Sequence, residues 1–246
     1  MLGRLIVAGT VLGVLTIAIA ISSGRATAQA GPASASSIVA QPHLLDNIAA
    51  VVEADVVQAQ YLYDDAAGPR TQVTLANIVV RRGTAPDASS FVQFGGPLPS
   101  GEYVRATDLP SLNPGSHYVL FIMGGPWFFT PIWANLAFRV ESVGGRSLVV
   151  APDGFAVTHF GSDGIAVGTT QLVDFSKEVD PTSPRAAAVV DPNAADLKSA
   201  LDVPAFIAAA NTAIDRAGGL STMAMSFRQS PRTHWYAGET SPATTP

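Results

Sequence analysis

The chain contains no cysteine, and only two of its 246 residues are lysine. The absence of cysteine excludes disulfide bonds, thiolate metal sites and a cysteine nucleophile. Charged residues make up 13% of the chain, about half of the usual ~25% of a soluble domain. The net charge is -5, and a nucleic-acid partner is not expected because phosphate binding requires clustered lysine and arginine.

Glycine, proline and apolar residues, in contrast to charged residues, are abundant. The chain has 22 glycines and 18 prolines, and 48% of its residues are hydrophobic. Such a composition favours short strands separated by turns over long helices. A length of 246 residues corresponds to one or two domains.

The first thirty residues, Met1 to Ala30, have the organisation of a secretory signal peptide. Arg4 gives a positive start, Leu5 to Ile21 carries no charge, and Ala28-Gln29-Ala30 provides a small-x-small cleavage site. We predict cleavage after Ala30 and a secreted or cell-envelope protein. The alternative is an uncleaved membrane anchor, because the uncharged stretch lies at the lower limit of a spanning helix. Contact with a membrane is expected only in that case.

The exported part divides into three regions. Residues 31–42 are small and polar apart from Ile38 and Val39, and we interpret them as a flexible linker. Residues 43–218 are expected to form the folded domain. Residues 219–246 are interpreted as a C-terminal tail that is partly disordered, because Gly238 to Pro246 combine threonine, serine and proline with few apolar residues.

Two helices are expected to flank the strands of this domain. The first precedes the strands and ends near Glu53, because apolar residues recur there at helical spacing. The second follows the last strand, with Asp202 as its N-cap, Pro204 in the first turn and Gly218 just past its end. The apolar positions of the first helix are Leu44, Leu45, Ile48, Val51 and Val52.

Between the helices the sequence consists of short β-branched and aromatic runs punctuated by glycine and proline. This spacing predicts a mainly β fold, a small OB-like barrel of about 7–9 short strands with the C-terminal helix packed outside. The strands are predicted at Val56–Tyr63, Gln72–Arg81, Phe91–Phe94, Tyr103–Ala106, His117–Met123, Leu136–Glu141, Ser147–Ala151, Phe155–Phe160 and Ile165–Val167.

Four short motifs carry a family resemblance. They are Ala54-Asp55-Val56-Val57, the run from Val73 to Gly83 that ends in Arg-Arg-Gly, the Gly95-Gly96 pair, and Gly115-Ser116-His117-Tyr118-Val119-Leu120-Phe121. In this order the chain resembles a broad group of exported bacterial proteins of unknown function. Its strand order is similar, more remotely, to the OB-like barrel of netrin and metalloproteinase-inhibitor modules. Those inhibitors act through an N-terminal cysteine, so the resemblance does not imply that mechanism here.

The strongest candidate for ligand binding is an aromatic segment entered through Gly124-Gly125. Trp127, Phe128, Phe129 and Trp133 lie within seven residues, with one proline directly before them and another among them. Exposed together, these rings would form an apolar surface able to stack on sugars, peptides or acyl chains. The alternative is that they fill an open end of the barrel.

No catalytic residue, metal site or cofactor is assigned. His159, Ser162 and Asp163 stand close in sequence, but a hairpin turn explains them equally and no nucleophile elbow surrounds the serine. The four histidines are scattered singly, without zinc spacing.

The sequence therefore predicts an exported, non-catalytic binding or interaction module for an unknown extracellular ligand or protein. Two alternatives stay open: a secreted hydrolase that uses His159 and a nearby acidic residue, and an inhibitor of a secreted peptidase.

Overall fold

A computed structural model describes residues 38–39, 43, 45–65, 68–104, 109–125, 130–161, 163–175, 195–223 and 227. The predicted signal peptide and cleavage site lie outside these residues. Of the predicted linker, the described part contains Ile38 and Val39, which form a short strand paired with Ala166 and Ile165. No helix in the described residues combines the length and apolar character needed to cross a membrane.

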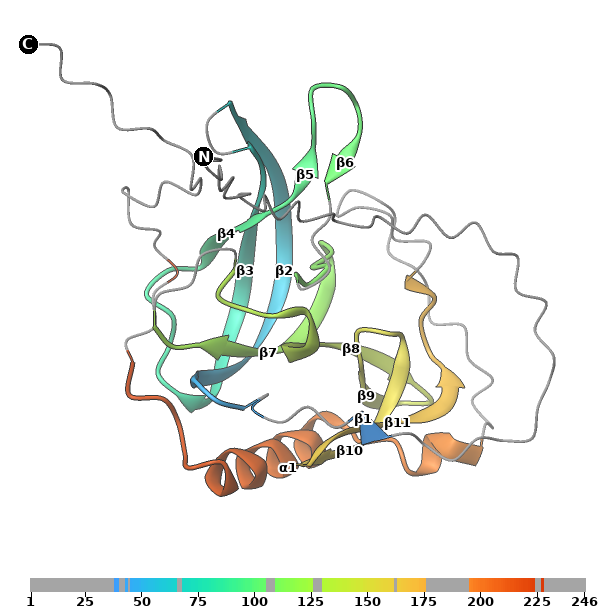
Figure 1. The fold of residues 1–246 in the computed structure, drawn as a ribbon. Helices are drawn as coiled ribbons and strands as arrows, with labels where there is room; N and C mark the ends of the chain where they lie inside the picture. Colours follow the sequence, from blue (N-terminus) through green and yellow to red (C-terminus); the bar gives the residue numbers. More distant parts are fainter. Residues whose placement is uncertain are drawn as a thin grey trace, which may run out of the picture. The chain divides into compact units, whose positions relative to one another are not determined.

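The described residues form mainly antiparallel β-structure (Figure 1). The main sheet has the order β1-β11-β10-β9-β8-β7-β2-β3-β4, and β5 pairs with β6 in a separate hairpin. The bounds are β1 Ile38–Val39, β2 Ile48–Asp64, β3 Gly68–Gly83, β4 Ser90–Phe94, β5 Gly96–Pro97, β6 Tyr103–Val104, β7 Ser116–Met123, β8 Ala137–Val143, β9 Arg146–Val150, β10 Phe155–Gly161 and β11 Gly164–Gln171, with the 3-10 turns η1 Ala134–Leu136 and η3 Ala195–Lys198 and the helix α1 Val203–Arg216.

The mainly β class is confirmed, but the prediction of a small OB-like barrel is wrong, because the sheet does not close into a barrel. The sheet stays open because β1 and β4 stand at its two ends. Both are short, at two and five residues, and neither reaches the other. Strand number and spacing, on which the barrel prediction rested, do not specify whether the two end strands meet.

The predicted helix before the first strand is also wrong, because Ile48 begins β2 and the strand continues to Asp64. Ile48 and Val51 pack into the core on the face that α1 covers. Ala50 and Val52 pack into the core on the opposite face. A strand buried on both faces is apolar at nearly every position, and such a run includes residues at helical spacing by chance.

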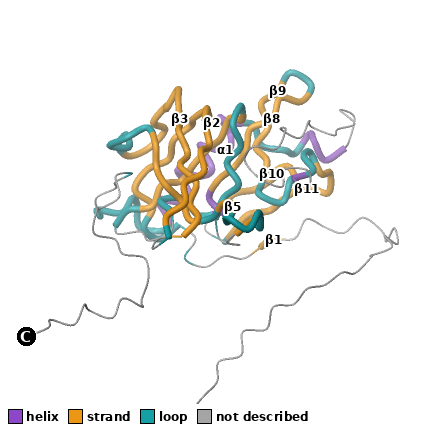
Figure 2. The backbone as a smooth tube through the Cα atoms, turned by 90° about the horizontal axis from the view of Figure 1, so that it is seen from above, coloured by secondary structure: helices purple, strands orange, loops and turns teal. Residues whose placement is uncertain are grey.

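The C-terminal helix is confirmed, with the predicted ends. The Asp202 carboxylate accepts a hydrogen bond from the Ala205 amide at 3.0 Å, and Gly218 has a φ of 105° just past the last turn. Figure 1 shows α1 beside β10, and in Figure 2, seen from above, strands of the sheet pass in front of the helix. Phe206 is fully buried and lies against Phe138 and Phe160, with ring centroids 4.9 and 5.0 Å away.

Two further clusters fill the opposite face of the sheet. One lies over β2, β3 and β7 and includes Phe91 and Leu112. The other lies over β8, β9 and β10 and is closed by residues 172–175 and 197–200. Beside this second cluster, Arg139 and Glu141 form a buried ion pair on β8, with 2.6 Å between Nε and Oε1.

Candidate functional site

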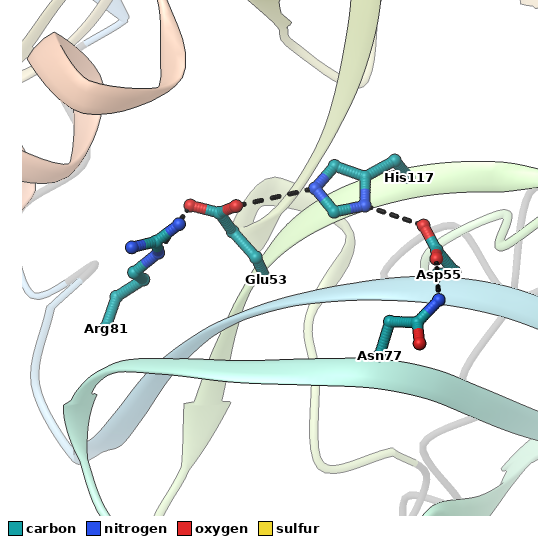
Figure 3. A network of polar contacts seen from close by, with 5 residues as sticks. All are labelled: Glu53, Asp55, Asn77, Arg81 and His117. Carbon is teal, nitrogen blue, oxygen red and sulfur yellow. Dashed lines mark hydrogen bonds and ion pairs between the residues drawn. The ribbon is translucent and has the colours of Figure 1, made fainter.

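A network of five polar side chains connects three neighbouring strands (Figure 3). Glu53 and Asp55 come from β2, Asn77 and Arg81 from β3, and His117 from β7. In the sheet, Asp55 is paired with His117. The network therefore lies where strands distant in sequence become neighbours.

Local irregularities of the β2–β3 pair place two of these side chains. In β2, the consecutive residues Val51 and Val52 pair with Arg82 and Val80 of β3. Arg81 is therefore an extra residue in β3. A second shift of register lies beside Asn77, whose φ of 51° is in the left-handed region that asparagine tolerates better than most residues. Such bulges change the direction of a side chain relative to a regular strand. Here they accompany the two β3 side chains that reach the carboxylates of β2.

His117 is the centre of the network. Its Nδ1 lies 2.7 Å from Asp55 Oδ1, and its Nε2 lies 3.5 Å from Glu53 Oε2. Arg81 Nε donates to Glu53 Oε1 at 2.7 Å, and Asn77 Nδ2 donates to Asp55 Oδ2 at 2.7 Å. The side chains of His117 and Asp55 are 35% and 36% exposed, whereas Glu53 is buried. Solvent therefore reaches one side of the network.

The hydrogen bonds favour the charged forms of two members. The bond from Asn77, followed by the bond with His117, lowers the pKa of the Asp55 carboxyl below its usual range. The bond with Glu53 raises the pKa of the Arg81 guanidinium. With two carboxylates and one guanidinium, the network has a formal charge of -1 + -1 + 1 = -1 when the imidazole is neutral.

The arrangement can hold a proton but offers little for covalent catalysis. A neutral imidazole carries one N–H, whereas the imidazolium donates from both nitrogens. The network contains no serine, threonine or tyrosine hydroxyl that could act as a nucleophile. Among the described residues no group of three or more His, Asp or Glu side chains could hold a metal ion.

The structure describes one member of the predicted aromatic site. Trp127, Phe128 and Phe129 lie outside the described residues. Trp133 is 48% exposed and stands just before η1, so the alternative that it fills a barrel end does not hold for this ring.

The backbone around Trp133 is well anchored. Thr130, Pro131 and Ile132 are buried. The Met123 amide donates to the Pro131 carbonyl at 2.9 Å, which joins the segment to the end of β7. The Trp133 carbonyl accepts from the Leu136 amide, also at 2.9 Å.

His159 and Asp163, which stand close in sequence, form a contact at the surface. His159 Nε2 lies 3.3 Å from Asp163 Oδ1, and both side chains are more than half exposed. The bond with His159 is the main cause that lowers the pKa of the Asp163 carboxyl. Ser162 lies outside the described residues. The two side chains therefore form a solvated contact at the hairpin that joins β10 and β11, as the turn interpretation predicts.

The sequence alone did not reveal the network. Asp55 and His117 both stand in motifs that carry the family resemblance and that suggested no site, and the two are separated by 62 positions. Arg81 and Arg82 were noted only as part of a strand end. Arg81 contacts Glu53, whereas Arg82 donates to the Asn211 carbonyl and to Asp215 of α1. The sequence holds one signal: after the apolar Val73 and Leu75, the polar Asn77 occupies the next position on the same face of the strand. This break in the alternation is compatible with a bulge, but it does not show which side chains the bulge brings together.

No family model, curated protein or solved structure matches the chain.

Proposed function

We propose that the protein is an exported, non-catalytic binding module whose ligand contacts the surface around Trp133. The observation that supports this proposal is the half exposure of a tryptophan whose backbone neighbours are buried. Large exposed apolar side chains are costly to leave in water, and tryptophan is enriched among the residues that dominate binding energy.

The anchored backbone makes Trp133 suitable as a contact residue. Since the neighbours of Trp133 are already ordered, the protein loses little backbone entropy when a ligand packs on the ring. Met223 is 47% exposed and packs against Gly125, at the start of the same segment, so closely that a Cβ there would lie 2.7 Å from its Cε. The expected ligand presents a flat apolar surface, such as a sugar ring face or an aromatic side chain.

Neither alternative function is favoured by an observation in the described residues. A hydrolase that uses His159 would need that imidazole to be oriented by a partner, and the Asp163 contact is long and exposed. The peptidase-inhibitor alternative stays a prediction from the sequence.

The experiment uses the mature protein with Trp127→Phe and Trp235→Phe, so that fluorescence reports on Trp133 alone. We expect strong acrylamide quenching in the folded state, and protection from quenching when sugar oligomers or aromatic peptides bind. Binding by Trp133→Ala is measured by calorimetry, because this variant lacks the fluorescent ring. It should lose binding, while the control Tyr103→Ala, at another exposed aromatic position, retains it. Equal binding by both variants would contradict the proposal.

A further inference from the structure

His117 stands between two carboxylates of the same strand. Its two ring nitrogens point to Asp55 and Glu53 (Figure 3), at 2.7 and 3.5 Å. Each carboxylate is in turn bonded to a different residue of β3, Asp55 to Asn77 and Glu53 to Arg81.

We propose that this network is a proton-dependent clasp, in which the imidazolium form of His117 holds β7 to β2 and, through Asn77 and Arg81, to β3. It is independent of the ligand surface around Trp133, which lies beyond the other end of β7.

The need for a proton follows from the number of hydrogen-bond donors. An ionised carboxylate only accepts, and a neutral imidazole can donate to only one of the two carboxylates. The other nitrogen would then turn a lone pair toward a second carboxylate. Asp55 is held in its ionised form by its bonds from Asn77 and His117, which lower the pKa of its carboxyl. The imidazolium satisfies both acceptors.

The charges around His117 balance when its ring carries the proton. On β2 the neighbouring groups are Glu53 and Asp55, and on β3 the charged group is Arg81, already bonded to Glu53. On β8 the residue paired with His117 is Val140, which carries no charge. At the end of α1, Asp215 is bonded to Arg82. Protonation of His117 therefore brings the formal charge of the network from -1 to zero.

The sign of the pH effect follows from this charge balance. When the His117 ring carries the proton, both of its contacts, with Asp55 and with Glu53, are attractive. As the pH rises and the proton leaves, the contact with Glu53 turns repulsive and the clasp weakens. As the pH falls into the carboxylate range, Asp55 is neutralised and the clasp weakens again. The region that loosens first should be β3 around Asn77 and Arg81, where the bulges lie.

Hydrogen exchange of the mature protein tests the clasp at pH 5.5 and pH 8.0. After correction for the intrinsic pH dependence of exchange, we expect amides of residues 76–83 to lose roughly fivefold more protection at the higher pH than those of α1. In His117→Gln this difference should disappear. The matched control is His159→Gln, which removes an exposed histidine–aspartate contact and should keep the wild-type difference.

A second measurement covers the case in which His117→Gln does not fold. Asp55→Asn keeps the shape of the carboxyl group but removes its charge, so the pH-dependent loss of protection should shrink. In NMR spectra of the wild type, the Arg81 amide should shift together with the His117 ring between pH 5.5 and pH 8.0. Unchanged protection of residues 76–83 between the two pH values, or an Asp55→Asn profile identical to wild type, would overturn the proposal.

Discussion

Asn77 combines an unusual backbone conformation with a side-chain hydrogen bond. Its φ is 51°, and its amide donates to Asp55. We expect Asn77→Ala to lower the free energy of unfolding by about 2 kcal/mol, since it loses the bond and places a Cβ residue in the left-handed region. Asn77→Gly should cost about 1 kcal/mol less, because glycine accepts this φ. Urea denaturation measures both, and equal losses would show that the backbone contributes nothing.

Two buried hydroxyls provide a second residue-scale comparison. The Thr71 hydroxyl donates to the Gly95 carbonyl at 2.9 Å, whereas the buried Ser116 hydroxyl has no hydrogen-bond partner in the part of the chain described. Thr71→Val should therefore cost about 1 kcal/mol, and Ser116→Ala should be neutral or stabilising. Thermal unfolding of the two variants decides this, and a larger loss for Ser116→Ala would point to a bridging water.

At the scale of elements, α1 is the part in which the sequence was most informative. Its N-cap, its proline and the glycine past its end are local signals that do not depend on the rest of the fold. We expect Asp202→Ala to lower stability by about 1 kcal/mol. Asp202→Ser should retain most of it, because serine is also an effective N-cap. The two chemical denaturation midpoints give the comparison, and equal midpoints for Ala and Ser would contradict the capping role.

The ion pair of β8 predicts a different pattern of losses. Arg139 and Glu141 are buried together, and Arg139 lies over the Phe175 ring. Arg139→Met removes the guanidinium from its ion pair with the buried Glu141 carboxylate, and we expect a loss of about 3 to 5 kcal/mol.

The double variant Arg139→Met, Glu141→Leu removes both charges and should recover most of the stability. Their unfolding free energies form a double-mutant cycle. Additive losses would contradict a direct coupling between the two side chains.

The β elements show where sequence patterns were insufficient. Most predicted strands exist, because alternation and turn residues are local. The sequence pattern predicts a helix and a shorter strand where the structure has the single strand β2, because burial on both faces removes the alternation that identifies a strand. The His117 network was missed for a related reason: its geometry arises from register and bulges, which depend on long-range pairing.

At the scale of the whole molecule, the prediction of export can be tested directly. If Met1 to Ala30 is a signal peptide, the mature protein should begin at Gly31 when it is expressed in a bacterial host. N-terminal sequencing or intact-mass measurement of the exported protein decides this. Retention of Met1 in a membrane fraction would instead support an uncleaved anchor.

The core packed against α1 draws residues from β2, β7, β8, β9, β10 and β11, while the pairing of β9 with β10 rests on Ala156 and Val150. The helix therefore completes a core that the sheet alone cannot close. Because α1 follows every strand of the sheet in the sequence, we expect a nascent chain to leave this apolar face uncovered until the helix has been synthesised.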